Sequence, residues 1–219
     1  MLGYVLEALT GMGLSASAGV NAYIPLLAIG LLDRYTGLID LPPSWHWLAN
    51  GWVLLILIVL ELIEQIADKI PAVDSVNDVL HTVIRPTAGG LAFGAASESK
   101  TVTVSDPGAF FSSHQWVPVA AGIVIALCVH GTKAAARPVI NVSTLGVGAP
   151  VASVIEDVFS VVTSVLAIVV PFLVILMGAL FIWFVVVVVR RRRRRREQKR
   201  AARAAARAGS QPAYPYPRR

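Results

Sequence analysis

Long apolar stretches, broken by short polar ones, dominate the first 189 residues of this chain. Uncharged runs cover residues 8–32, 47–60, 86–97, 115–129 and 158–189. A helix needs about 20 apolar residues to cross about 30 Å of hydrocarbon, and most of these runs are near that length or somewhat shorter. The pattern therefore predicts an all-α, polytopic membrane protein with about five membrane helices, some of them broken or half-helices.

Two prolines within these runs, Pro25 and Pro171, each remove a backbone N–H from the hydrogen bonds of a helix. Pro25 has no N–H for the carbonyl oxygen of Asn21, which makes that oxygen a candidate backbone ligand in mid-membrane. Pro171 lies in residues 149–189, which exceed one membrane crossing. Every polar group of that stretch precedes Pro171, so we expect a polar half-helix over roughly residues 150–168, followed by a spanning helix. The alternative is one long helix that bends at Pro171.

Charge is distributed unevenly along the 219 residues, of which 56% are hydrophobic and 15% charged. Residues 190–219 hold 13 of the 19 bases and one acid, so residues 1–189 hold 6 bases and 12 acids. A soluble domain would show more charge and shorter apolar runs. We therefore expect a membrane domain over residues 1–189 and a basic, largely disordered tail over residues 190–219.

The basic run from Arg190 to Arg196 directly follows an apolar segment. By the positive-inside rule it places the C-terminus in the cytoplasm, as part of a multi-pass protein of the cell membrane. Anionic lipid is the expected partner of the run. Nucleic-acid binding is the more specific alternative. Membrane orientation and contact with anionic lipid already explain the basic run, so we expect no nucleic acid as a partner. A homo-oligomer or a membrane-protein partner is left open.

Two early segments resemble two later ones. The stretch from "GWVLL" to Lys69 matches the stretch from "QWVPV" to Lys133, and "PAVDSVNDVL" resembles "PVASVIEDVF". An internal repeat of a helix and a half-helix would fit the duplicated architecture of many transporters. Short apolar segments also match by chance, so both explanations stay open.

Ionisable and polar residues follow helical spacing in four stripes beside the apolar runs. The stripes are Glu61, Glu64 and Asp68; Asp74, Asp78, His81 and Arg85; His130, Lys133, Arg137 and Asn141; and Ser153, Glu156, Asp157, Ser160 and Ser164. Charged groups at membrane depth usually face one another or water and mark a site. The alternative is that they lie in the headgroup region or form ion pairs between helices. The transport or ligand-binding candidates are Glu61, Asp68, Lys69, Asp74, Asp78, His81, Arg85, His130, Lys133, Arg137, Asn141, Glu156 and Asp157.

The stripes contain more acids than bases. Seven carboxylates face four bases, Lys69 included, which leaves three negative charges unmatched. An unmatched buried carboxylate holds a proton or binds a cation, and Asp78 and Asp157 are the candidates. His81 and His130 are candidate proton relays or metal ligands. No cofactor is expected. A divalent cation is chemically allowed on carboxylate oxygens, whereas no zinc motif is present and the chain has a single cysteine.

Three segments carry a resemblance to a known family. They are "GLSASAGVNAYIPLL", "ADKIPAVDSVNDVLHTVIRPTAG" and "HGTKAAARPVINVSTLG" with the following "SVIED". Together they resemble the bacterial integral-membrane family catalogued as domain of unknown function 4126, over about residues 10–165. The resemblance implies that the polar stripes are the family's site and that the chain resides in a bacterial membrane.

The polar stripes favour a transporter or permeation protein coupled to protons or cations, in which the bases serve as counter-ions or anion contacts. A carrier of a lipid-linked substrate is a variant of this hypothesis. The alternative is a non-catalytic membrane scaffold or subunit whose ion pairs are assembly contacts. An enzyme is less favoured, because no nucleophile with a base stands at recognisable spacing.

Overall fold

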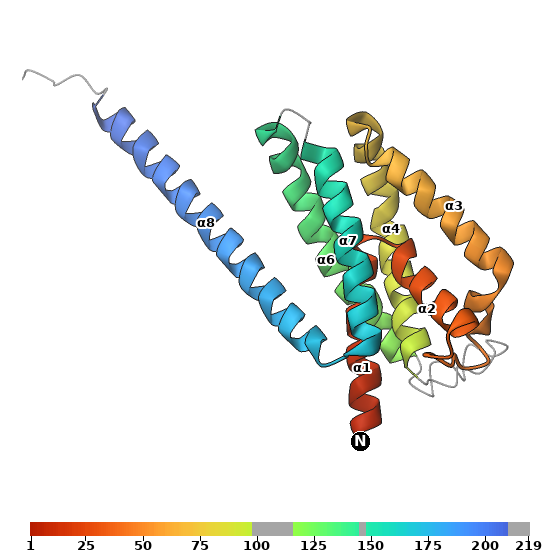
Figure 1. Cartoon of the computed structure of the whole chain (residues 1–219). Helices are drawn as coiled ribbons and strands as arrows, with labels where there is room; N and C mark the ends of the chain where they lie inside the picture. The colour runs from red at the N-terminus through yellow and green to blue at the C-terminus, as the bar shows by residue number, and fades with distance from the viewer. Residues whose placement is uncertain (98–115, 145–147, 210–219) are drawn as a thin grey trace, which may run out of the picture. The chain divides into compact units, whose positions relative to one another are not determined.

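The computed structural model describes residues 1–97, 116–144 and 148–209 (Figure 1), and in parts of the helices it describes the backbone alone. The side chains of Asp74, Asp78 and Asn141 lie outside this description. The described residues form helices and contain no strand, which confirms the all-α prediction. The helices are α1 (Leu2–Val20), α2 (Tyr23–Tyr35), the 3-10 helix η1 (His46–Ala49), α3 (Gly51–Ala67), α4 (Pro71–Ala96), α6 (Trp116–Ser143), α7 (Gly148–Val169) and α8 (Leu173–Gly209).

The chain divides into two compact units, Met1–Leu176 and Met177–Arg219. The first unit contains α1 to α7, and the second contains most of α8. This helix continues through the Arg run to Gly209, whereas the sequence predicted a largely disordered tail. The last ten residues, 210–219, lie outside the described residues.

Three described helices are long and apolar enough to cross a membrane, which supports a membrane-inserted protein. These candidate spans are Trp116–Arg137, Pro150–Val169 and Leu173–Arg191. The predicted count of about five spans is not confirmed. The helix breaks around Pro171 as expected, and α7 has nearly the predicted bounds of 150–168. By length and composition, Pro150–Val169 is a candidate span and not a half-helix. The apolar residues that follow Ser164 make α7 long enough to be a candidate span.

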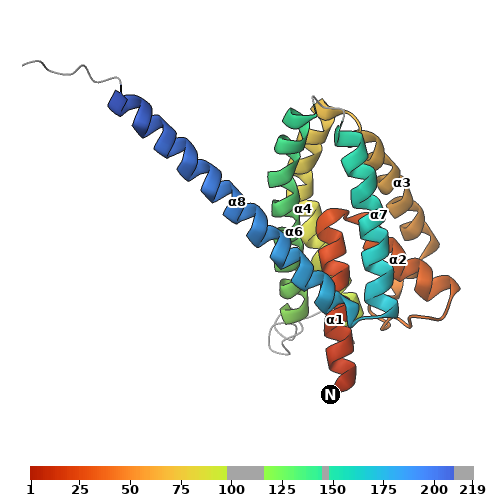
Figure 2. The same ribbon diagram turned by 60° about the vertical axis from the view of Figure 1, so that its left-hand side comes forward.

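The first apolar run forms two helices instead of one. α1 ends at Val20, Asn21 has an extended backbone (φ −139°, ψ 125°), and α2 begins at Tyr23. Figures 1 and 2 show α1 rising into the middle of the first unit and α2 turning back from there. Pro25 lies in the first turn of α2, where an N–H has no partner within the helix. The break at Asn21 therefore lies inside the bundle.

Within the first unit, α1 packs against α4, α6 and α7 (Figure 2). Gly11, Ser15 and Gly19 recur every four residues along α1 and bring it close to its neighbours. A Cβ atom on Gly19 would lie 2.6 Å from the carbonyl oxygen of Ala126, and Ser15 Oγ donates to the carbonyl oxygen of Gly89 at 2.9 Å. Small residues thus allow the end of α1 to reach the polar sides of its neighbours.

Candidate functional site

Asn21 lies at the break between α1 and α2 and is almost fully buried, with 1% of its surface exposed. Its Oδ1 accepts hydrogen bonds from the backbone N–H groups of Tyr23 (3.0 Å) and Ile24 (3.3 Å), which satisfies the start of α2. Because the oxygen faces these donors, Nδ2 must face the opposite way. Nδ2 donates to Glu61 Oε1 at 3.1 Å and to Asp157 Oδ1 at 3.0 Å. One amide therefore joins a carboxylate of α3 to a carboxylate of α7.

Two bases of α6 hold the neighbouring carboxylates. Lys133 Nζ lies 2.9 Å from Glu156 Oε2 and donates to the carbonyl oxygen of Val20, also at 2.9 Å. Arg137 Nη2 lies 2.9 Å from both Glu156 Oε2 and Asp68 Oδ2. α6 therefore contacts three other helices: α1 at its last residue, α3 at its C-terminal end and α7 at Glu156.

A second group of contacts surrounds Arg85 of α4, which is fully buried. Its Nη2 donates to Glu64 Oε1 at 2.8 Å, and its Nη1 lies 3.0 Å from His130 Nδ1. A guanidinium only donates, so His130 Nδ1 is an acceptor. Nε2 of the neutral ring then carries the hydrogen and donates to Thr82 Oγ1 at 3.2 Å.

The described side chains of this network do not balance in charge. Their carboxylates are Glu61, Glu64, Asp68, Glu156 and Asp157, and their bases are Arg85, Lys133 and Arg137. Five acids and three bases leave an excess of two negative charges. Glu61 and Asp157 account for this excess, since neither forms an ion pair with a described base.

The two surplus carboxylates lie close together. Both accept from the same nitrogen of Asn21, at 3.1 and 3.0 Å, so their two oxygens lie within about 6 Å of each other. Two unit charges at about 6 Å repel by about 3 kcal/mol at an effective dielectric constant of about 20. Glu61 is 8% exposed, and its Oε2 is buried without a hydrogen-bond partner. Asn21, which donates to both carboxylates, and Gln65, whose Nε2 donates to Glu61 Oε1 at 3.1 Å, offset this repulsion.

A line of hydroxyl groups continues from this point along the contact between α1 and α7. Ser17 Oγ lies 2.6 Å from Ser160 Oγ and 2.8 Å from Ser164 Oγ, and all three side chains are fully buried. Further along, Thr10 Oγ1 donates to the carbonyl oxygen of Ala167 at 2.9 Å. We call Ser17, Ser160 and Ser164 the hydroxyl cluster.

The four predicted stripes meet in this network wherever their side chains are described. Lys69 is exposed at the turn between α3 and α4 and takes no part in it. Asn21 enters through its side-chain amide, whereas the sequence suggested its backbone oxygen. Members that the sequence did not single out are Ser17, Tyr23, Gln65, Asn77 and Thr82. Ser17 and Asn21 are four residues apart in the sequence, a spacing typical of one helix face, and that spacing was the available signal.

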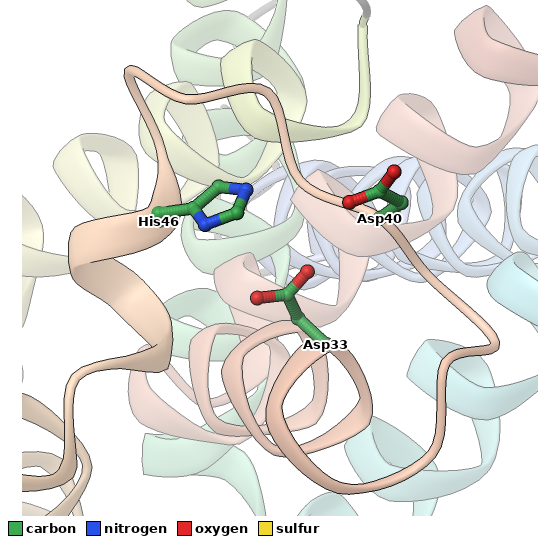
Figure 3. Close-up of side chains that lie close together, drawn as sticks. All are labelled: Asp33, Asp40 and His46. Carbon is green, nitrogen blue, oxygen red and sulfur yellow. The ribbon is translucent and has the colours of Figure 1, made fainter.

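A smaller cluster lies between α2 and η1 (Figure 3). One ligand atom from each of Asp33, Asp40 and His46 lies within 4.8 Å of the other two, a grouping that could hold a metal ion. Asp33 is half-buried, and the other two side chains are exposed. Asp33 Oδ1 already accepts from the backbone N–H of Leu41 at 2.8 Å. Water would have to supply most ligands of a divalent ion here.

The chain matches the family model of the domain of unknown function 4126 over residues 8–191. This range contains every described residue of the network and extends beyond the segments that carry the resemblance. Neither the curated proteins nor the solved structures contain a match to the chain.

Proposed function

Because this chain belongs to the family of the domain of unknown function 4126, which carries no assigned activity, we propose its function from the site itself. The protein is a multi-pass membrane transporter or permeation protein of the cell membrane, coupled to a proton or cation. Its site lies where α1 and α2 separate. The surplus pair of carboxylates at this break, joined by Asn21, is the observation that carries the proposal.

Transporters commonly place substrate and ion sites where a helix is interrupted inside the bundle. There the backbone groups of the interrupted helix become available, and charged side chains of other helices face them. In this chain the break is surrounded by α3, α6 and α7, each of which contributes a charged side chain. Uncompensated charge at such a position costs free energy. It is therefore better explained by a functional site than by helix packing.

The direct ion pairs support the second candidate function, a membrane scaffold or subunit. Arg137 joins two carboxylates and Arg85 joins another, and such pairs can fix helix positions without any ligand. They explain the balanced part of the network. They do not explain why Glu61 and Asp157 add two further negative charges.

Solvent access to the break separates the two functions. The test uses Ala22→Cys in a Cys128→Ser background, because Ala22 is fully buried beside Asn21 and Cys128 is the sole native cysteine. The protein is reconstituted in liposomes, and a membrane-impermeant thiol reagent is added from one side or the other. A transport pathway predicts labelling from both sides, as the site opens alternately.

Two control positions define the limits of this assay. Val124→Cys lies on the exposed side of α6 within a candidate span, where lipid should prevent labelling. Leu38→Cys lies exposed between α2 and η1 and should react from one side only. If the cysteine at position 22 stays unreactive from both sides while these controls behave as expected, the scaffold function is favoured.

The C-terminal part of α8 has a separate role in the proposal. Arg190 to Arg196 follow a candidate span, and the run fixes this end in the cytoplasm and contacts anionic lipid. A partner subunit or a second copy of the chain remains compatible with either function.

A further inference from the structure

We infer that Glu61 and Asp157, joined through Asn21, share one exchangeable proton, and that the hydroxyl cluster of Ser17, Ser160 and Ser164 conducts it. This inference rests on the proposed function, because it identifies the coupling ion of the same site. The step is the uptake of one H⁺ by a carboxylate oxygen, which forms an O–H bond and reduces the excess of negative charge from two to one. Release breaks that bond and returns H⁺ to water.

The geometry favours a proton over a metal ion. Asn21 Nδ2 occupies the position between the two carboxylates and can only donate, so it cannot be a ligand of a cation there. A hard metal ion needs six or more oxygen ligands. The buried oxygen that this pair offers without a hydrogen-bond partner is Glu61 Oε2. One lone pair is enough for a proton.

The charges around the pair are otherwise assigned to partners. The described ionisable groups of the surrounding network are Tyr23 of α2, Glu64 of α3, Asp68 at its end, His81 and Arg85 of α4, His130, Lys133 and Arg137 of α6, and Glu156 of α7. Each of the three bases contacts one of the other carboxylates. Proton uptake at Glu61 or Asp157 therefore lowers the charge excess without breaking an ion pair.

The hydroxyl cluster lies about one helical turn from this pair along both α1 and α7. Ser17 precedes Asn21 by one helical turn, and Ser160 follows Asp157 by about one turn. Ser17 Oγ is within hydrogen-bond distance of both other hydroxyls, at 2.6 and 2.8 Å. A hydroxyl accepts and donates at once, so linked hydroxyls can pass a proton along their hydrogen bonds. The proton relays of pumps and transporters are built from Asp, Glu and His side chains, and the hydroxyl cluster lies next to two such carboxylates along α1 and α7.

The test is infrared difference spectroscopy of the full-length protein in lipid nanodiscs, recorded after a step in pH. A protonated carboxyl group has a carbonyl stretching band that a carboxylate lacks. The wild-type protein should gain such a band on acidification. Glu61→Gln and Asp157→Asn should each abolish it, because removing either carboxylate also removes the repulsion that makes the other take up a proton.

Two further variants make the result specific. Asp40→Asn is the control, since Asp40 is an exposed carboxylate between α2 and η1, outside the network, and its variant should retain the band. Ser17→Ala should retain the band but gain it several-fold more slowly, because it removes the hydroxyl that links the other two. This kinetic measurement tests the inference even if a carboxylate variant fails to fold.

A band that persists in both Glu61→Gln and Asp157→Asn would overturn the inference. So would a titration with Na⁺ or K⁺ at constant pH that removes the band from the wild-type protein, since the pair would then be a site for an alkali cation. The spectroscopy requires no transport. If the variants lose the band but thiol reagents never label position 22, the proton site is retained and the transporter is refuted. If position 22 is labelled from both sides but the band persists in the variants, only the proton site is refuted.

Discussion

Replacement of Asn21 tests the structural argument most directly, because this side chain makes four hydrogen bonds at the centre of the bundle. Asn21→Ala removes two bonds to carboxylates and two that satisfy the start of α2. Hydrogen bonds between membrane helices contribute about 0.6 to 1.7 kcal/mol each, and loss of a side chain that satisfies a helix start costs about 1 kcal/mol. We expect Asn21→Ala to lower the free energy of unfolding by about 2 to 4 kcal/mol.

Asn21→Asp separates these contributions. Its carboxylate can still accept from the first turn of α2, but it replaces the donor by a third negative charge about 3 Å from Glu61 and Asp157. At an effective dielectric constant of about 20, each such contact costs about 5 kcal/mol. We therefore expect Asn21→Asp to be less stable than Asn21→Ala. Adding Glu61→Gln should recover part of the loss, because the new amide can donate to the new carboxylate.

The measurement is thermal unfolding in detergent, followed by circular dichroism. A loss of about 2 to 4 kcal/mol corresponds to about 5 to 15 °C for a chain of this size. Asn50→Asp is the matched control, because Asn50 also accepts from the start of a helix (Trp52 N, 2.9 Å) but is exposed and joins no carboxylates. The reasoning is refuted if Asn21→Asp is as stable as the wild type, or if Asn21→Asp and Asn50→Asp lose equal stability.

Three further changes have defined outcomes. Arg137→Gln should cost about 3 to 5 kcal/mol in the same unfolding assay, because it leaves two carboxylates without their shared base; Arg137→Lys should cost less, and equal losses would contradict the ion-pair argument. Gly122→Ala should cost about 1 to 3 kcal/mol, since its Cβ would overlap the carbonyl oxygen of Gly89, whereas Gly131→Ala meets open space and should be neutral or slightly stabilising. Deletion of residues 200–219 should leave membrane insertion and site accessibility unchanged, as measured by fractionation and thiol labelling; loss of labelling with normal insertion would show that the tail contributes to the site.

The sequence by itself determined the class of fold and most of the groups in the site. Apolar runs of nearly membrane length can only satisfy their backbone as helices. A proline interrupts the hydrogen bonds of a helix, and α7 and α8 separate near Pro171 as expected. The stripes could be recognised in the sequence because residues three, four and seven apart share a helix face. Charge on such a face beside apolar runs is costly unless it is paired or belongs to a functional site. Both facts are local properties of the chain.

Tertiary structure alone decided how those groups combine. The sequence could not show that α2 turns back at Asn21, since a continuous helix and a re-entrant pair have the same apolar pattern. Nor could it show which carboxylates lack a base, because stripes have the same spacing whether their charges are paired or not. Asn21 and Asp157 are 136 positions apart, and only the packing of α1 against α7 brings them within 3.0 Å. The surplus charge at the break is therefore a property of the packed bundle, in which distances between helices select the partner of each buried ion.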